Sequence, residues 1–290
     1  MILVTGATGT IGSELVKLLS ARGETFRAYV RNTKKATALN IPRMEIFKGD
    51  LSDTVALDKA MLGITRVFLL SSPDPDQVKL QGNVVKAAKK AKVSLIVKQS
   101  AFGAGADSTV SLARWHWKTE EEIKKSGIPY SILRPVMFMQ NLLMYAPEIR
   151  TEGVLRVPMK DARLALIDAR DIAAVAVTIL VGKGHEGKTY ELTGPEALSY
   201  EKIAGLISEI TGRHVSYVDI TLADARKALI HGGMPEWFAD DIRKLFEMFR
   251  TGRGARLSTA VADITGVKPR RLEEFLHDYS DVFLGELVHH

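Results

Sequence analysis

The sequence lacks cysteine entirely, and it lacks any hydrophobic run long enough to cross a membrane. Without Cys among its 290 residues, the chain can form neither disulfides nor thiolate metal sites. No apolar stretch approaches the ~20 residues that a membrane-spanning helix needs. A strand-like hydrophobic run begins at Ile2, so we expect no signal peptide ahead of it. These absences predict a protein of the reducing cytoplasm that has no membrane partner.

The sequence is equally poor in the residue patterns of hydrolases, metalloenzymes and nucleic-acid-binding proteins. No pair of catalytic carboxylates, no metal-ligand spacing and no nucleophile beside a base stands out, so we expect no metal site. The formal net charge of +6 is scattered, because runs such as KAAKKAK are balanced by KTEEEIKK. Such runs are typical of solvated helix faces rather than of a nucleic-acid interface. The terminal His289 and His290 are interpreted as the remnant of a purification tag.

What the sequence does contain is a regular alternation of strand-like and helix-like segments over its first half. This alternation predicts an α/β fold with a doubly wound parallel sheet, similar to the Rossmann fold. Residues 1–152, completed by 165–183, are expected to form this domain, and 184–288 a smaller α+β lobe. Thr119, followed by Glu122, is a capping pattern that predicts a helix start. We expect strands at 2–4, 25–31, 44–50, 66–72, 94–100 and 129–135.

Three glycines follow the first strand at once, in the stretch MILVTGATGTIG. Behind them Leu15, Leu18 and Leu19 share one helical face, so the order is strand, glycine turn, helix. Glycines at this place let a pyrophosphate approach free N–H groups at the helix N-terminus. The alternative is a tight turn that holds no ligand. The residues assigned to this dinucleotide site are Gly6, Thr8, Gly9, Thr10, Ile11 and Gly12.

The end of the second strand predicts which dinucleotide is bound. An acidic residue there would hydrogen-bond a ribose 2′-hydroxyl, whereas a basic one accommodates a 2′-phosphate. The stretch YVRNTKKA has no carboxylate and clusters Arg31, Lys34 and Lys35. A guanidinium grips phosphate through two donors, and a lysine adds charge. We therefore expect NADP(H) to be preferred over NAD(H). The alternative is that these basic residues lie on a loop and bind no ligand.

Several longer motifs carry a resemblance to a known family. The stretches TGATGTIG, VRNTKKA, KGDLSD, TEEEIKKSGIPYSILRP, FMQN, GHEGKTYELTG and GMPEWFAD together resemble the NmrA-like, atypical short-chain dehydrogenases. The likeness is strongest to the quinone and triphenylmethane-dye reductases of that family, and it covers nearly the whole chain. It implies an NADPH-binding fold with a small C-terminal lobe and a cleft for planar, often aromatic acceptors. Residues 1–152, completed by 165–183, are then the NADP-binding domain, and 184–288 is the substrate-binding lobe.

The resemblance also implies roles for residues beyond the glycine turn. Asp50 and Leu51 are expected beside the adenine. Strand ends are expected to border the nicotinamide and its ribose, and the segment after the sixth strand to line the acceptor side. The alternative for the serines at the strand ends is that they only form turns. The alternative for the Met and Phe residues after the sixth strand is that they only pack in the hydrophobic core. Further cofactor residues are thus Ser71, Ser72, Ser100, Ala101, Phe102 and Pro135, and acceptor residues are Met137, Phe138, Asn141 and Trp237.

The catalytic pair of ordinary short-chain dehydrogenases, Tyr-x-x-x-Lys, is missing, and Tyr130 with Arg134 comes nearest. His116 matches the histidine before TE in the quinone and dye reductases, and it is the candidate proton donor; the alternative is a histidine packed between Trp115 and Trp117. We expect an NADPH-dependent reductase of quinone-like or other conjugated acceptors. The alternatives are a nucleotide-sensing regulator without turnover and a biosynthetic reductase of one phenolic substrate. Homodimer formation stays open.

Overall fold

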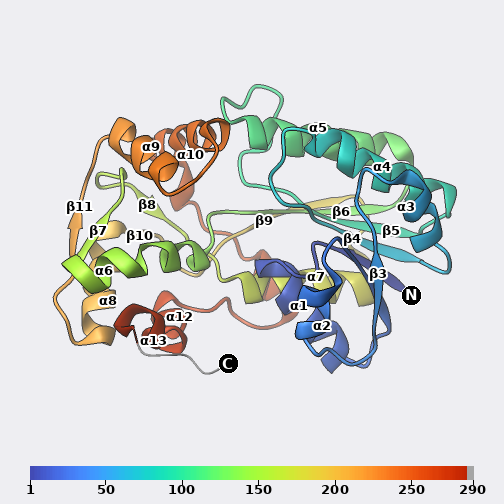
Figure 1. Cartoon of the computed structure of the whole chain (residues 1–290), viewed down its shortest axis with the longest axis horizontal. Coiled ribbons are helices and arrows are strands. Elements are labelled where there is room, and N and C mark those ends of the chain that lie inside the picture. The colour runs from blue at the N-terminus through green and yellow to red at the C-terminus, as the bar shows by residue number, and fades with distance from the viewer. Residues whose placement is uncertain (286–290) are drawn as a thin grey trace.

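The apolar runs of the sequence become the strands of one seven-stranded parallel sheet in the computed structural model, which describes residues 1–285 (Figure 1). The strand order reverses between β1 and β4, which opens a crevice beyond the carboxyl ends of these strands. The predicted doubly wound α/β fold is confirmed. In sheet order the strands are β3 (Met44–Lys48), β2 (Phe26–Val30), β1 (Ile2–Thr5), β4 (Arg66–Leu69), β5 (Leu95–Gln99), β6 (Tyr130–Pro135) and β9 (Lys188–Leu192).

Helices cover both faces of the sheet (Figure 1). One face carries α1 (Thr10–Ala21), α2 (Thr33–Ala38) and α7 (Ala169–Val181), and the other carries α3 (Thr54–Ala60), α4 (Gln77–Lys90) and α5 (Ser111–Ser126). The apolar stripes seen in the sequence face the strands, as Leu15 and Leu19 of α1 do with no exposed surface. Within residues 1–285, no helix is both long and apolar enough to span a bilayer.

The helix expected to start at Thr119 starts eight residues earlier. Thr119 is buried in the middle of α5, where its hydroxyl donates to the carbonyl oxygen of Trp115 at 3.1 Å. The first amides of α5, those of Ser111 and Leu112, donate instead to the carboxylate of Asp241 at 3.0 and 2.8 Å. A local capping pattern was therefore misread, because the helix is capped by a residue 130 positions away.

The C-terminal lobe lies at one end of the sheet (Figure 1). One strand assigned to it, β9, instead pairs with β6 at the sheet edge. The two terminal histidines and the end of the predicted lobe lie outside the described residues, and the division into two domains stays a prediction. The remaining elements, of which η1 and α6 fall within the range 1–152 predicted for the larger domain, are η1 (Met139–Tyr145), α6 (Ala146–Glu152), β7 (Val154–Arg156), β8 (Arg163–Leu164), β10 (Leu198–Ser199), α8 (Tyr200–Thr211), β11 (Ser216–Val218), α9 (Leu222–His231), α10 (Glu236–Phe249), η2 (Arg253–Ala255), α11 (Ala260–Thr265), α12 (Leu272–Asp278) and α13 (Ser280–Leu284).

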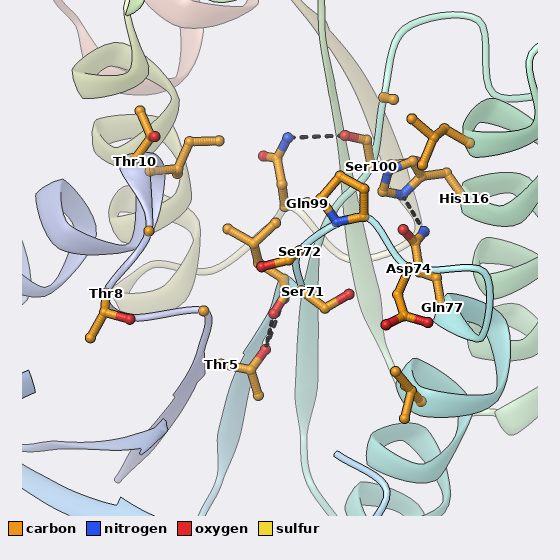
Figure 2. Close-up of a pocket in the computed structure, with 18 of the residues that line it drawn as sticks. Thr5, Thr8, Thr10, Ser71, Ser72, Asp74, Gln77, Gln99, Ser100 and His116 are labelled. Atoms are coloured by element: carbon orange, nitrogen blue, oxygen red, sulfur yellow. Dashed lines mark hydrogen bonds between the residues drawn. The ribbon is translucent and has the colours of Figure 1, made fainter. Parts of the chain in front are cut away.

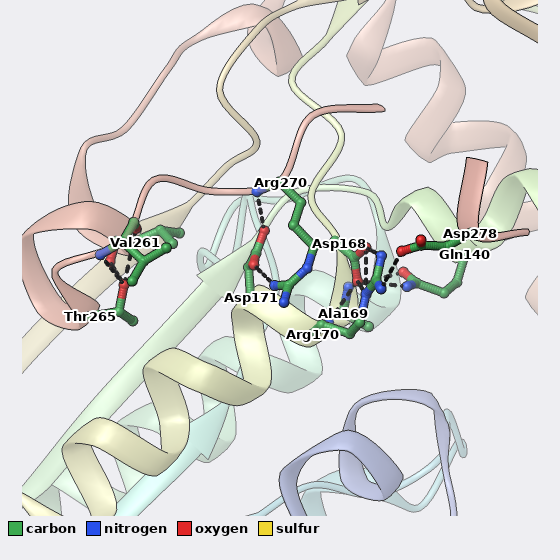
Figure 3. A network of polar contacts seen from close by, with 10 residues as sticks. Gln140, Asp168, Ala169, Arg170, Asp171, Val261, Thr265, Arg270 and Asp278 are labelled. Atoms are coloured by element: carbon green, nitrogen blue, oxygen red, sulfur yellow. Dashed lines mark hydrogen bonds and ion pairs between the residues drawn. The ribbon is translucent and has the colours of Figure 1, made fainter. Parts of the chain in front are cut away.

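A network of buried charge joins the lobe to the sheet at the start of α7 (Figure 3). Asp168 caps α7 by accepting from the Arg170 amide at 2.8 Å, and it also accepts from Gln140 at 2.9 Å. The Arg170 guanidinium donates to Asp168 and, at 2.6 Å, to Asp278 of α12. Burial alone would raise the pKa of Asp168, but the hydrogen bonds from Arg170 and Gln140 outweigh it and lower the pKa. This junction holds the lobe in place beside the crevice.

Candidate active site

A cleft of about 960 Å³ opens where the carboxyl ends of β1, β4, β5 and β6 meet, and α10 of the C-terminal lobe forms part of its wall. Such crevices are where doubly wound folds bind dinucleotides. Figure 2 shows part of its lining, from Thr8 and Thr10 of the glycine turn to His116. The predicted acceptor residues Met137, Phe138 and Asn141 line the same cleft. All but two of the predicted site residues line it, and the exceptions are Gly12 and Trp237.

The glycine turn uses its three glycines in different ways. Gly6 has a φ of +69°, which favours glycine. A Cβ on Gly12 would lie 2.0 Å from the Gly6 carbonyl oxygen, so Gly12 brings α1 close to β1 and does not line the cleft. A Cβ on Gly9, the N-cap of α1, would make ordinary contact with the protein at 3.4 Å. The fold does not require Gly9 to be small, whereas a phosphate approaching the amides at the start of α1 would.

The nucleotide end of the cleft is lined by Arg31, Lys35, Asp50 and Leu51, whereas Lys34 is not part of the lining. Arg31 and Lys35 are exposed, with their charges available to a ligand. The Asp50 carboxylate accepts from the Ser52 hydroxyl at 2.6 Å and its amide at 2.9 Å, and these bonds, aided by Arg31, lower the pKa of Asp50.

The middle of the cleft brings together the predicted strand ends with several residues that sequence reasoning missed, Gln99 among them. Gln81 donates to the Ser71 hydroxyl at 2.7 Å, and the Ser100 hydroxyl donates to the buried Glu120 at 2.5 Å. Gln99, which we did not predict, also lines the cleft, and its amide nitrogen donates to the Ser100 carbonyl at 2.9 Å. Its buried Oε1 lacks a hydrogen-bond partner within residues 1–285. A bound ligand that carries a donor, such as a nicotinamide carboxamide or a ribose hydroxyl, fits this need.

The acceptor end is mainly apolar. Met137, Phe138 and Asn141 line it as expected, but Trp237 lies outside the lining and its ring packs 5.6 Å from that of Trp115. The next residue, Phe238, takes the place predicted for Trp237. The spacing of the α10 residues on the cleft is i, i+4, i+7 and i+11, a helical stripe that could have been found in the sequence. These residues are Phe238, Ile242, Leu245 and Phe249.

His116 lies on the cleft wall in the second turn of α5, not at a helix start (Figure 2). Its Nδ1 lies 3.1 Å from Nζ of Lys98 and 3.4 Å from the Gln77 side-chain nitrogen. Burial, together with the neighbouring Lys98, lowers the pKa of His116 well below its usual value, so the ring is neutral at pH 7. The arrangement places a neutral imidazole on the wall of the cleft.

Comparison with known proteins identifies the family. A model of the NmrA-like family matches residues 1–276. The chain belongs to the NmrA-like family. Within it, an NAD(P)H azoreductase of Xenophilus azovorans is 40% identical over 283 residues, which cover 98% of this chain and 99% of that protein.

Two solved structures share the NmrA-like architecture over almost their whole length. An NADPH-dependent quinone oxidoreductase from Escherichia coli, complexed with NADPH, has a TM-score of 0.87 at 31% identity and covers 97% of this chain and 100% of its own. A Citrobacter triphenylmethane reductase complexed with NADP(H) has a TM-score of 0.85 at 26% identity, with 99% and 100% covered. The family resemblance seen in the sequence is confirmed. Among the described residues, no cluster of three or more His, Asp or Glu could hold a metal ion.

Proposed function

We propose that this NmrA-like protein is an NAD(P)H-dependent reductase that transfers hydride to a quinone-like or other conjugated, aromatic acceptor. The observation that carries the proposal is one continuous cleft: a glycine turn and basic residues line one end, and an apolar wall from α10 lines the other. The azoreductase, quinone and dye reductases among its relatives support the same reaction class. The absence of cysteine supports action in the reducing cytoplasm.

We infer further that NADP(H) is preferred over NAD(H). Arg31 and Lys35 both line the nucleotide end, and no carboxylate follows β2 to accept a ribose hydroxyl. Arg31→Ala should shrink the preference while it leaves NADH affinity nearly unchanged. Titration calorimetry with both cofactors measures this, and Lys34→Ala is a matched control because Lys34 does not line the cleft. Equal affinities in the unaltered protein would contradict the preference.

The chemistry requires little from the side chains beyond positioning. NADPH, when bound, supplies the hydride. Gly6 and Gly9 shape the turn for the pyrophosphate, and Gln99 can accept a donor from the nicotinamide end. Phe238 and Phe138 hold a planar acceptor and exclude water. His116 offers a donor to an acceptor oxygen.

Stopped-flow oxidation of bound NADPH tests the proposal against a panel of quinones, triphenylmethane dyes and enones. We expect turnover with at least one class. Phe238→Ala should change which acceptors react, whereas Trp237→Ala, one residue outside the lining, should change them much less. Tight NADPH binding without turnover of any acceptor would favour the alternative function, a nucleotide-sensing regulator.

A further inference from the structure

Lys98 is a lysine with no exposed surface in the fourth residue of β5. Its Nζ contacts two acceptors, Nδ1 of His116 at 3.1 Å and the carbonyl oxygen of Gln99. Neither partner is a carboxylate. A buried ammonium that is held only by neutral acceptors is costly for the fold, so its presence calls for a reason beyond packing.

The contacts of His116 determine which ring nitrogen carries the proton. Lys98 and the amide group of Gln77 both approach Nδ1, and both are donors. Figure 2 shows the Gln77 contact. Nδ1 is therefore the acceptor and the neutral ring carries its proton on Nε2. The structure records hydrogen bonds to Nδ1 alone within the described residues, which leaves Nε2–H as the donor for a molecule in the cleft.

The surroundings of Lys98 bring its pKa close to neutral pH. Burial lowers the pKa of Lys98 to about 7, although Glu120 on α5 acts in the opposite direction. Glu120 is engaged by Arg134 of β6, with 3.0 Å between Nε and Oε1. The other polar neighbour of the His116 ring is the neutral Gln77 on α4, and Asp74, which follows β4, lines the same cleft.

We propose that Lys98 is a positioning residue and proton reservoir for the reaction: it holds His116 as the Nε2–H tautomer and replaces the proton that His116 gives to the acceptor. The inference rests on the proposed function. In quinone reduction the acceptor gains two electrons and one hydrogen as hydride, and the cofactor is oxidised. The second hydrogen leaves His116 Nε2 as a proton while Nδ1 takes one from Lys98.

After this step, His116 is again neutral with its proton on Nδ1, and Lys98 is a neutral amine. After product release the cleft takes up one proton from the solvent: it binds at Nε2 while Nδ1 returns its proton to Lys98, which restores the starting state. A cationic triphenylmethane dye takes hydride on carbon and needs no proton, so its reduction bypasses the relay. The two acceptors therefore separate the relay from hydride transfer itself.

The kinetic test measures single-turnover NADPH oxidation from pH 5.5 to 9 with a quinone and with a cationic dye. In the unaltered protein, the quinone rate should be highest below pH 7 and fall above it, because deprotonated Lys98 cannot supply the proton; the dye rate should be flat. Lys98→Met should lower the quinone rate at pH 6 about tenfold, less than the ~10²–10⁴ of direct acid–base catalysis, and remove the pH dependence. The exposed Lys118→Met on α5 should keep the original profile.

Equal losses on both acceptors, or a pH dependence that survives in Lys98→Met, would overturn the relay but leave the reductase intact. Failure of every acceptor to react would instead refute the proposed function. A second measurement is independent of turnover: ¹⁵N spectra of histidine-labelled protein with NADP⁺ bound, with His116→Gln used for assignment. At pH 6 we expect the Nε2–H tautomer of His116, and a shift toward Nδ1–H in Lys98→Met. An Nδ1–H tautomer in the unaltered protein would overturn the proposal even if the variant does not fold.

Discussion

Asp168 at the junction between sheet and lobe, and Lys98 behind the cleft residue His116, are both ionisable side chains with no exposed surface. Asp168 receives hydrogen bonds from Arg170, from Gln140 and from a backbone amide, and its pKa is lowered, so the charged form is favoured. Lys98 meets a neutral ring and a carbonyl oxygen, and its pKa is lowered as well, so the charged form is disfavoured.

A lowered pKa thus has opposite meanings for Asp168 and for Lys98. For a carboxyl group, a lowered pKa marks a charge that the fold stabilises; for a lysine it marks a charge that the fold tolerates at a cost. Groups at the junction should therefore govern stability and hardly affect the chemistry. Groups in the cleft should govern binding or rate and contribute little to stability.

The largest change is a loss of stability, and we expect it when Asp168 at the junction is substituted. Asp168→Ala removes the cap of α7 and leaves the Arg170 guanidinium half-buried with one partner fewer, which should cost about 3–5 kcal/mol of unfolding free energy. The contribution is present above the unfolded pKa of aspartate and is lost as pH falls through the lowered folded pKa. Urea unfolding at pH 7 and pH 3 measures both. Asp58→Ala, which breaks an exposed pair with Lys90, should cost at most about 1 kcal/mol.

Substitution of Lys98 is expected to change the unfolding free energy in the opposite direction. Lys98→Met should stabilise the protein at pH 6 by an amount within the ~1–4 kcal/mol seen when buried charge is replaced by apolar side chains. Because the folded pKa lies near 7 and the unfolded one near 10.5, the unaltered protein should recover stability between these values and the gain should shrink. Thermal unfolding across pH 6–10 checks this. A variant that is strongly destabilised at pH 6 would show that Lys98 belongs with the structural charges.

His116→Ala should slow quinone reduction by roughly 10- to 100-fold, the lower part of what acid–base assistance supplies. Reduction of a cationic dye should be slowed much less, because no oxygen is protonated. Steady-state kcat/KM with both acceptors is the measurement. His116 would lose its role as proton donor if both acceptors were slowed equally.

The smallest effect concerns the glycine turn. Gly9→Val should weaken NADPH binding at least tenfold, about 1.4 kcal/mol, because the side chain obstructs the phosphate. The fold should persist, since a Cβ at Gly9 makes only ordinary contact. Gly12→Ala is the contrasting variant: its Cβ meets backbone at 2.0 Å, so it should lower stability. Calorimetry and circular dichroism separate the two, and unchanged NADPH affinity in folded Gly9→Val would refute a pyrophosphate at this turn.

Much of the fold and of the cleft lining could be predicted, because the deciding signals are local. The order of strand, glycine turn and helix around Gly6 needs only a dozen residues, and parallel strands bring their carboxyl ends to one edge, which places Ser71 and Ser100. The face on which Lys98 points could not be predicted, because alternation along a strand buried on both sides carries no such signal. The start of α5 was missed because its cap, Asp241, comes from another part of the chain.

The capping of α5 by Asp241 has a consequence for how acceptor range can change. Asp241 sits on α10 between the cleft-facing Phe238 and Ile242, and it is 2% exposed. The helix that carries His116 is thus hydrogen-bonded to the helix that forms the apolar wall of the cleft. Substitutions on the cleft-facing stripe of α10 can change the shape of the wall while the hydrogen bonds to Asp241 keep α5 and His116 in place. The NmrA-like scaffold can therefore exchange one substrate for another without a change in its chemistry.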